Sequence, residues 1–389
     1  MKKRILIFSI AYHPFIGGAE VAVKEITQRL QDCDFTILTL MMGRGVSRFE
    51  KKDNVSIYRV GFSGSSRLSS SLNLPLIFSK YFFPFSATWK ALKLNKKEKF
   101  DLTWSIMANY AGFAALFFKL LKPKIPFLLT LQEGDPLEYI RKRVGVFMPL
   151  YKMIFTKADK IQAISHFLAD YALDMGHKGK IEIVPNGVNI ELFNQEYSLD
   201  AQKQSSEIVG KKNSEIILIT TSRLVNKNAV DIIIGALKFL PDNFKLFIAG
   251  QGEDEDKLLN LTKELKLESR VKFGGFVPYE ELPSLLKASD IFVRPSRSEG
   301  LGNSFLEAMA ARIPVIGTSV GGIPDFLEDG KTGFFVKVDD SKDLAEKVRT
   351  LSEDKNLIET VTSSAQKMVL EKYSWDSVSE RMKKIFKEL

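Results

Sequence analysis

Two glutamates separated by glycines are the residues best placed to do chemistry in this sequence. Glu299 and Glu307 lie at the ends of the stretch S-E-G-L-G-N-S-F-L-E, which runs from Ser298 to Glu307 and contains Gly300 and Gly302. Glycines let the backbone approach a ligand closely. Two carboxylates at this spacing could be a catalytic acid and base, a pair that binds one ligand, or two exposed charges beside a turn.

The elements around this stretch favour a ligand site. We expect a strand at Ile291–Arg294, then a loop, then a helix at Ser304–Ala311 that Asn303 or Ser304 could cap. The N–H groups and dipole of such a helix start bind phosphate at the carboxyl end of a strand. Glu299 before the loop and Glu307 inside the helix would then address different parts of one ligand.

Both halves of the chain alternate short apolar runs with amphipathic helical patterns, which is typical of parallel sheets wound with helices. The expected architecture is α/β, with two Rossmann-like doubly wound domains facing a central cleft. We expect an N-terminal domain at 1–195, a polar linker at 196–214 and a second domain at 215–372, with a C-terminal helix at about 373–389 packing back on the first domain. The expected strands are 4–10, 35–40, 55–59, 102–105, 127–131, 160–163, 181–184, 216–220, 245–249, 271–273, 291–294, 315–317 and 333–336.

Composition places the protein among ordinary globular proteins and predicts a cytoplasmic location. The 389 residues include one cysteine, Cys33, which excludes an internal disulfide framework and fits a reducing compartment. The opening M-K-K-R-I-L-I-F-S-I is read as a first strand rather than a signal peptide. No run of eighteen apolar residues predicts a membrane span.

Charge divides unevenly along the chain. Residues 1–195 carry 28 Lys and Arg against 16 Asp and Glu, whereas residues 196–389 carry 28 against 31. Aromatic and basic residues mix in two segments of the first half, 62–100 and 139–155. Such a mixture suits an anionic membrane surface, with the protein peripheral on the inner face of the cell membrane. The alternative is a pair of core helices with charged ends on a solvated basic domain.

An ordered set of motifs along nearly the whole chain resembles the retaining glycosyltransferases of family 4, also called glycosyl transferases group 1, which have the two-domain GT-B fold. In the first half these are P-F-I-G-G-A-E (14–20) and V-P-N-G-V-N (184–189). In the second half they are T-S-R-L-V (221–225), F-I-A-G-Q-G (247–252), F-G-G-F-V-P (273–278), A-S-D-I-F-V-R-P-S (288–296), E-G-L-G-N-S-F-L-E-A-M-A (299–310), P-V-I-G-T-S-V-G-G-I-P-D (314–325) and D-G-K-T-G-F-F-V (329–336).

The resemblance makes 1–195 the acceptor-side domain and 215–372 the nucleotide-sugar donor domain, and it implies a donor site and an activity. It implies transfer of a hexose-type sugar from a nucleotide-sugar donor to a glycan or lipid-linked acceptor, as in cell-envelope polysaccharide biosynthesis. Glu299 would bind hydroxyls of the sugar and Glu307 those of the ribose, and Arg223 would bind the diphosphate. The other implied donor-binding residues are Gly17, Gly18, Phe276, Val277, Gly300, Leu301, Gly302, Asn303 and Ser304.

Two departures from the family pattern affect the expected catalytic set of Arg223, Lys227 and Glu299. Many relatives have lysine five residues after the arginine, but here Asn228 holds that place and Lys227 precedes it. Asn228 could instead cap the next helix. Many relatives also have histidine after the strand 127–131, where this chain has Gln132. Glutamine cannot exchange a proton at neutral pH, so the acceptor-side candidates are Gln132, Glu133, Asp135 and His13.

Retention of configuration without an obvious protein nucleophile favours a front-face reaction, in which the leaving diphosphate helps to remove the acceptor proton. We expect no cofactor and no metal. Asp254, Glu255 and Asp256 match a D-x-D pattern, but they open an expected helix, where acidic residues are ordinary dipole partners.

Other classes of protein remain as alternatives. A nicotinamide-dependent oxidoreductase lacks its complete G-x-G-x-x-G after either first strand. An epimerase or phosphorylase-like enzyme of related fold would also use sugar nucleotides or phosphates. A non-enzymatic anion-binding protein would leave Arg223, Glu299 and Glu307 unexplained together, and no nucleic-acid partner is expected.

Overall fold

The computed structural model describes the chain except residues 1, 15–16, 44, 65–73 and 213, and the side chains of 62–64 and 74–76 are likewise outside the description. Parts of the motif 14–20 and of the aromatic segment 62–100 therefore lie outside the described residues. The chain forms two compact units. Unit 1 comprises Met1–Asn186 with Trp375–Leu389, and unit 2 comprises Gly187–Ser374. The segment 196–214, which we predicted as a linker, contains helix α8 (Leu199–Val209) of unit 2.

Unit 1 is built on an eight-stranded sheet with the order β3-β4-β2-β1-β5-β6-β7-β8. All seven strands predicted in this half form and pair in parallel. The sequence prediction missed β3, a polar edge strand that pairs antiparallel with β4. The strands are β1 (Lys3–Phe8), β2 (Cys33–Met42), β3 (Phe49–Lys52), β4 (Val55–Gly64), β5 (Leu102–Ile106), β6 (Phe127–Leu131), β7 (Lys160–Ala163) and β8 (Ile181–Ile183).

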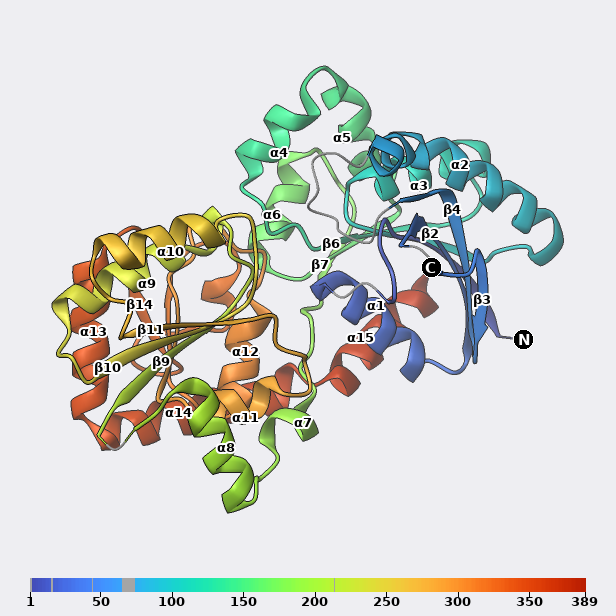
Figure 1. Cartoon of the computed structure of the whole chain (residues 1–389). Helices are drawn as coiled ribbons and strands as arrows, with labels where there is room; N and C mark the ends of the chain where they lie inside the picture. Colours follow the sequence, from blue (N-terminus) through green and yellow to red (C-terminus); the bar gives the residue numbers. More distant parts are fainter. Residues whose placement is uncertain (1, 15–16, 44, 65–73, 213) are drawn as a thin grey trace. The chain divides into compact units, whose positions relative to one another are not determined.

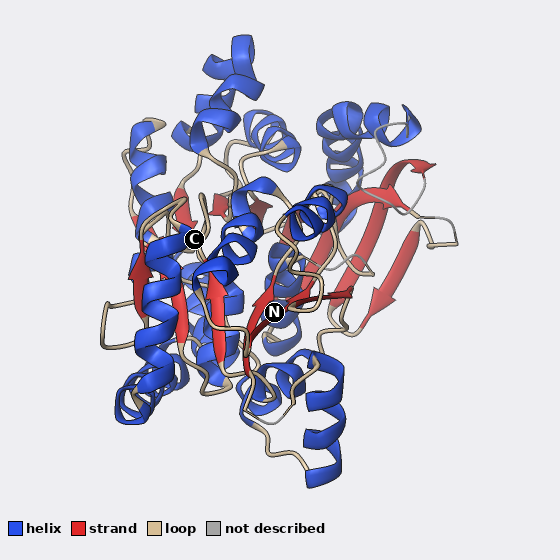
Figure 2. Ribbon diagram, turned by 60° about the vertical axis from the view of Figure 1, so that its left-hand side comes forward, coloured by secondary structure: helices blue, strands red, loops and turns tan. Residues whose placement is uncertain are grey.

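Helices cover both faces of this sheet because its central strands are apolar on both sides (Figures 1 and 2). In β1, Ile5 and Ile7 pack in the cluster that includes α1 and α15, while Phe8 contacts Phe118 of α3 on the opposite face. The C-terminal helix α15 joins unit 1 through Phe386, which contacts Trp104. The helices are α1 (Gly18–Arg29), α2 (Leu74–Glu98), α3 (Tyr110–Leu121), α4 (Leu137–Val144), η1 (Gly145–Phe147), α5 (Met148–Thr156), α6 (His166–Asp174) and α15 (Trp375–Glu388).

Unit 2 contains a six-stranded parallel sheet with the order β11-β10-β9-β12-β13-β14. All six predicted strands form: β9 (Ile216–Thr221), β10 (Phe244–Ala249), β11 (Val271–Gly275), β12 (Ile291–Arg294), β13 (Val315–Thr318) and β14 (Phe334–Val336). The strand order reverses between β9 and β12. In open parallel sheets, ligands bind outside the carboxyl ends of the strands at such a reversal.

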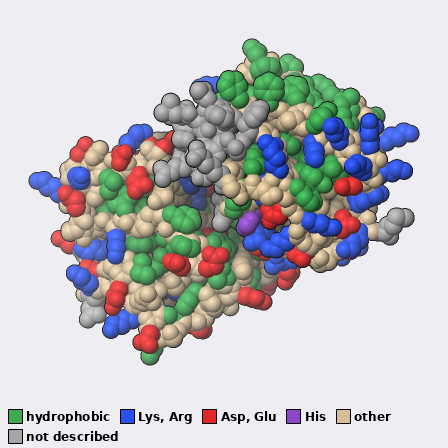
Figure 3. Space-filling model, turned by 45° about the vertical axis from the view of Figure 1, so that its right-hand side comes forward, with side chains coloured by type: hydrophobic (Ala, Val, Ile, Leu, Met, Phe, Trp, Pro, Cys, Tyr) green, Lys and Arg blue, Asp and Glu red, His purple; other side chains and the backbone are tan. Residues whose placement is uncertain are grey.

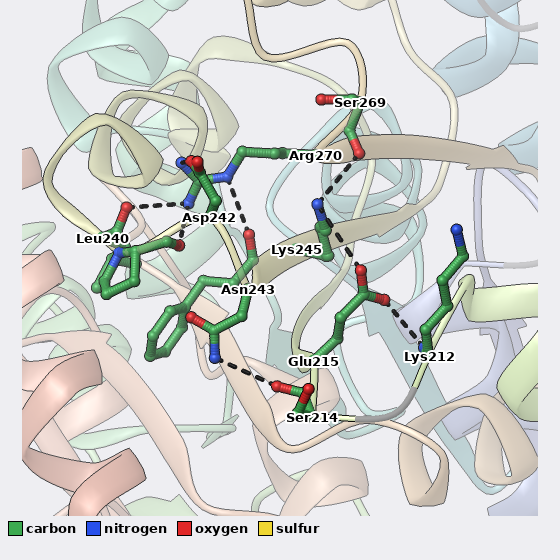
Figure 4. A network of polar contacts seen from close by, with 11 residues as sticks. Lys212, Ser214, Glu215, Leu240, Asp242, Asn243, Lys245, Ser269 and Arg270 are labelled. Carbon is green, nitrogen blue, oxygen red and sulfur yellow. Dashed lines mark hydrogen bonds and ion pairs between the residues drawn. The ribbon is translucent and has the colours of Figure 1, made fainter.

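The opposite, amino-terminal edge of this sheet is held by a buried arginine (Figure 4). Arg270 precedes β11 and donates to the carbonyl oxygens of Leu240, Pro241 and Phe244. These bonds fix the turn into β10 at the edge away from the ligand side. The helices of unit 2 are α7 (Ile190–Asn194), α8, η2 (Asn226–Asn228), α9 (Val230–Ala236), η3 (Leu237–Phe239), α10 (Glu255–Glu264), α11 (Leu282–Lys287), α12 (Asn303–Ala310), η4 (Ile323–Asp325), α13 (Ser341–Glu353) and α14 (Lys355–Lys372).

Candidate active site

The predicted residues for the sugar, ribose and diphosphate lie on segments that follow β9 and β12. These two strands are hydrogen-bonded neighbours, with Leu218 opposite Ile291. Arg223 follows β9 by two residues, and Glu299 lies in the loop that leads from β12 to α12. The site therefore occupies the position in the sheet that topology makes available to a ligand.

Arg294, the last residue of β12, joins three parts of this site. Its guanidinium donates to a Glu299 carboxylate oxygen at 2.6 Å, to the side-chain oxygen of Asn228 at 3.0 Å and to the Ser304 hydroxyl at 2.7 Å. The side chains of Arg294 and Glu299 are each only 12% exposed. A charge-assisted bond at this depth fixes the position of the Glu299 carboxylate.

The backbone of Glu299 is held as firmly as its side chain. Its carbonyl oxygen accepts a bond from Gly322 N at 3.2 Å, and Gly321 lies so close that an added Cβ would be 1.8 Å from that oxygen. Gly321 also has a φ of +56°. Only glycine meets both demands, so the turn after β13 shapes the loop that carries Glu299.

The start of α12 differs from the prediction. Asn303 and Ser304 do not cap the helix: the N-cap is Gly302, with a φ of +102° and no side-chain cap. The Ser304 hydroxyl instead accepts the bond from Arg294. An uncapped start leaves backbone N–H groups for a ligand, which is the arrangement that binds phosphate. Gly300, Leu301 and Gly302 are buried in the loop that precedes it.

Glu307 lies one turn into α12, and its carboxyl group is buried. Burial raises its pKa from 4.5 to about 7, and the nearby charge of Arg294 opposes this rise only in part. The two glutamates therefore differ in setting: Glu299 is paired with an arginine, and Glu307 is enclosed without an ion pair among the described residues. A ligand hydroxyl could satisfy such a carboxyl group.

Arg223 is exposed on the loop after β9, and a pair of glycines shapes that loop. A Cβ at Gly250 would lie 1.8 Å from the carbonyl oxygen of Ser222, and one at Gly252 would lie 2.1 Å from that of Leu224. The G-Q-G sequence thus serves close backbone packing beside Arg223. Lys227 lies half-buried in η2, and its carbonyl oxygen accepts a bond from Arg297 N.

Asn228 does not cap the following helix, whose N-cap is Ala229 without a side-chain bond. The Asn228 amide donates to the carbonyl oxygen of Arg223 at 2.6 Å and accepts from Arg294. It is 2% exposed. Asn228 therefore ties the Arg223 loop to the Arg294–Glu299 pair.

Phe276 and Val277 follow β11, where Gly275 turns the chain with a φ of +65°. The Phe276 side chain is 68% exposed, and Val277 is half-buried. An aromatic ring this exposed at the carboxyl edge of the sheet is available to contact a planar base.

In unit 1, the predicted residues lie on loops after β1 and β6. Gly17 is the N-cap of α1 and Gly18 its first residue, while His13 is exposed on the preceding loop. Gln132 accepts from the Asn186 side chain at 3.5 Å, and Asp135 is exposed.

Glu133 is the acceptor-side candidate with the most defined surroundings. Its carboxylate accepts from Ala108 N at 2.7 Å and from Gln132 N at 2.9 Å, which joins the loops after β5 and β6. Burial raises its pKa from 4.5 to about 7, against the effect of these backbone bonds. The sequence alone indicated Glu133 as a candidate but not the hydrogen bonds through which it joins the two loops.

Among the described residues, no group of three His, Cys, Asp or Glu side chains is arranged to hold a metal ion. Asp254, the first acid of the D-E-D stretch, is the N-cap of α10 and pairs with Lys257 at 2.7 Å. Glu255 and Asp256 lie in the first turn of that helix, as predicted for dipole partners.

Sequence reasoning missed Arg294 and Gly321. Arg294 stands in the quoted motif A-S-D-I-F-V-R-P-S as the final residue of a strand, and a charged residue ending an apolar parallel strand was the available signal. Gly321 stands in T-S-V-G-G-I-P-D, where the pair of glycines marked a turn but not its contact with Glu299.

Comparison with known proteins identifies the family. The family models for glycosyl transferases group 1 and for glycosyltransferase family 4 match residues 201–368 and 16–192. An uncharacterized glycosyltransferase of Methanocaldococcus jannaschii is 30% identical, with 99% of this chain and 98% of the relative covered. The alpha-monoglucosyldiacylglycerol synthase of Acholeplasma laidlawii is 22% identical, with coverage of 93% and 92%.

A solved structure agrees on the fold. The crystal structure of Anabaena HepE in complex with UDP-glucose matches with a TM-score of 0.80 and 20% identity over 99% of this chain and 100% of that one. The chain belongs to glycosyltransferase family 4 and has the GT-B fold, so both expectations are confirmed.

Proposed function

We propose that this glycosyltransferase moves a hexose from a nucleoside diphosphate donor to a glycan or lipid-linked acceptor of the cell envelope, with retention of configuration and without a metal. The observation that carries the proposal is the Arg294–Glu299 pair beside the uncapped start of α12. A fixed carboxylate beside the N-terminus of a helix without a side-chain cap suits a ligand with sugar hydroxyls next to phosphates.

Each part of the donor then has a partner. Glu299 accepts from the sugar hydroxyls, and Glu307 accepts from those of the ribose. The N–H groups at Gly302–Ser304 bind the phosphates, and Arg223 and Lys227 add positive charge. Phe276 and Val277 contact the base, while Gly17 and Gly18 belong to the helix start of unit 1 that would approach the phosphate or the acceptor.

The proposed reaction needs no protein nucleophile. The bond from the anomeric carbon to the phosphate oxygen breaks, and the acceptor oxygen bonds to that carbon on the same face. The acceptor proton passes to the departing phosphate oxygen. Arg223 and Lys227 stabilise the charge that grows on the diphosphate, so rate enhancement comes from orientation and electrostatics.

Two similar proteins support the substrate classes. The Anabaena structure holds UDP-glucose, and the Acholeplasma relative is named for a diacylglycerol glycolipid. We extend a nucleotide-hexose donor and a lipid-linked acceptor to this chain on that basis, with a cytoplasmic location and a peripheral position at the membrane. Within the described residues, no helix is long and apolar enough to cross a bilayer.

A thermal-shift screen with UDP-, GDP- and ADP-sugars tests the donor site. A ligand at one hundred times its dissociation constant stabilises the fold by about 2.7 kcal/mol, so one nucleotide should raise the melting temperature clearly. Glu299→Ala should reduce that shift, whereas the exposed Glu264→Ala on α10 should keep it. The proposal fails if no donor stabilises the protein and Glu299→Ala behaves as the wild type.

Two further measurements address the chemistry. Transfer should continue in EDTA, and proton NMR of the first product should show the anomeric configuration of the donor. Loss of transfer in EDTA that Mg²⁺ or Mn²⁺ restores would exclude the metal-free reaction, and an inverted product would exclude the front-face route.

A further inference from the structure

Helix α2 of unit 1 exposes a continuous row of apolar side chains, which we name the aromatic face. Phe78 and Trp89 are 59% and 60% exposed, and the spacing of the row places its members on one side of the helix. The other side is buried through Phe83, Ala87 and Ala91. The aromatic face consists of Ile77, Phe78, Tyr81, Phe82, Phe85 and Trp89.

Neighbouring helices continue this surface. Phe85 contacts Phe117 of α3 with ring centroids 5.5 Å apart, and Leu120 and Leu121 at the end of α3 are exposed. Figure 3 shows apolar side chains gathered over this part of unit 1 with basic side chains beside them. An apolar patch of this extent marks an interaction surface.

Positive charge surrounds the aromatic face. Helix α2 contains five lysines and one acidic residue, Glu98 at its end. Lys93 and Lys96 are exposed, and the Lys93 ammonium lies 3.4 Å from the centre of the Trp89 ring. The last turn of α4 adds Arg143, which lies near Tyr110. Apolar rings bordered by lysine and arginine are complementary to an anionic lipid surface.

Arg143 of α4 borders the aromatic face through Tyr110. Tyr110 contacts Tyr81 of that face with ring centroids 5.5 Å apart, and the Arg143 side chain lies near the Tyr110 hydroxyl. Burial and the positive charge of Arg143 lower the pKa of Lys80. A guanidinium beside the aromatic face suits a lipid phosphate, which it can bind through two parallel bonds.

We propose that the aromatic face and its basic border bind the surface of an anionic bilayer, with the rings at headgroup depth and the lysine and arginine side chains of the border on lipid phosphates. A second copy of this chain is a poor occupant, because facing copies would bring lysines against lysines. The inference rests on the proposed function only in its purpose, which is to bring unit 1 to a lipid-linked acceptor. Vesicle binding is measured without donor or acceptor, so either proposal can fail alone.

The wild-type protein carries its own probe. Its three tryptophans are Trp89, which is exposed, and Trp104 and Trp375, which are 1% and 2% exposed. Vesicles of phosphatidylcholine and phosphatidylglycerol in equal parts should shift tryptophan emission to the blue, and brominated acyl chains should quench it. Trp89→Phe should abolish both signals while binding in co-sedimentation persists. An unchanged wild-type spectrum in the presence of bound vesicles would overturn the proposed orientation.

Paired variants test each part of the surface. Phe78→Ser with Phe82→Ser should lower vesicle partitioning about tenfold or more, whereas the exposed Leu199→Ser in unit 2 should not. Lys93→Glu with Lys96→Glu should lower it more than about twentyfold, and Lys203→Glu with Lys367→Glu, equal in net charge, should lower it far less. Circular dichroism verifies folding of each variant.

Wild-type binding should weaken in high salt and be small on phosphatidylcholine alone. Equal binding to both vesicles, or no binding to either at low salt, overturns the proposal. Concentration-dependent dimerisation that Phe78→Ser with Phe82→Ser abolishes, in a protein that does not bind vesicles, would assign the surface to a second copy instead.

Discussion

The Arg294 guanidinium bonds at once to the Glu299 carboxylate, at 2.6 Å, and to the Asn228 side-chain oxygen, at 3.0 Å. Asn228 holds the place where many members of the family have lysine. A cation from the neighbouring strand therefore lies beside the position from which the lysine charge is missing. We infer an exchange of roles, in which Arg294 supplies charge near the proposed diphosphate site and Asn228 orients it.

A double-mutant cycle tests this exchange. Arg294→Leu should lower transfer about tenfold to a hundredfold, because Glu299 loses its buried partner. Asn228→Lys alone should also impair the enzyme, since it places a second cation against Arg294. The double variant should regain at least about tenfold over Arg294→Leu in kcat/KM. If the double variant is no better than the product of the single effects, the two positions do not exchange charge.

Gly321→Ala should damage the donor site from a distance. The new methyl group would meet the Glu299 carbonyl oxygen, so the loop must move. We expect transfer to fall about a hundredfold, since small displacements of positioning groups cost this much. Gly330→Ala is the matched control, because Gly330 also has a positive φ, of +71°, but an added Cβ there meets nothing within 4 Å. Equal losses in both variants would show that backbone strain alone is responsible.

The apolar strands could be predicted because burial on both faces leaves a simple pattern of β-branched and leucine-rich runs. Strand β3 could not, since F-E-K-K is polar and is ordered by its pairing with β4. At the site, sequence indicated Glu299 and Glu307 but assigned capping to Asn303 and Ser304. The side-chain role of Ser304 depends on Arg294, ten residues away, and such a contact leaves no local spacing to recognise.

Arg270→Leu should destabilise unit 2 without weakening the donor site per folded molecule. The variant leaves the carbonyl oxygens of Leu240, Pro241 and Phe244 without the arginine donor (Figure 4). A cost of about 2–4 kcal/mol follows from several lost bonds to a charged group. Thermal melts should show a lower midpoint for the ligand-free variant. Addition of donor should still raise that midpoint. A lost donor response in protein that remains folded would contradict a purely structural role.

Glu307→Gln should make the ligand-free protein more stable at high pH. The pKa of Glu307 is about 7 in the folded protein against 4.5 ordinarily, so the unfolded chain ionises first as pH rises. Stability therefore falls between about pH 4.5 and 7 and stays lower above, by up to about 3 kcal/mol. A glutamine side chain does not ionise, so the variant does not lose this stability. The difference in free energy of unfolding between the variant and the wild type should be large at pH 8 and vanish near pH 4.

Melting temperatures at several pH values measure this advantage, with the exposed Glu264→Gln as a control that should follow the wild type. The stabilised variant should also show a smaller donor-induced shift, because its amide replaces the carboxylate proposed to bind the ribose. An advantage that does not depend on pH would rule out ionisation of Glu307 as its cause.

Glu133→Gln should remove a pH dependence of transfer that belongs to unit 1. The ionised carboxylate accepts from Ala108 N and Gln132 N, and protonation below its pKa of about 7 weakens one of these bonds. The loop that carries Gln132 should then loosen, so wild-type kcat at saturating donor should fall as pH drops below about 7. Glu133→Gln imitates the protonated state and should be about tenfold slower at pH 8, with a flat profile.

Asp135→Asn, at an exposed neighbour, should keep the wild-type profile, and saturating donor separates this effect from Glu307. A Glu133→Gln enzyme with the full wild-type rate at pH 8 would show that the hydrogen bonds between the two loops do not contribute to the rate of transfer.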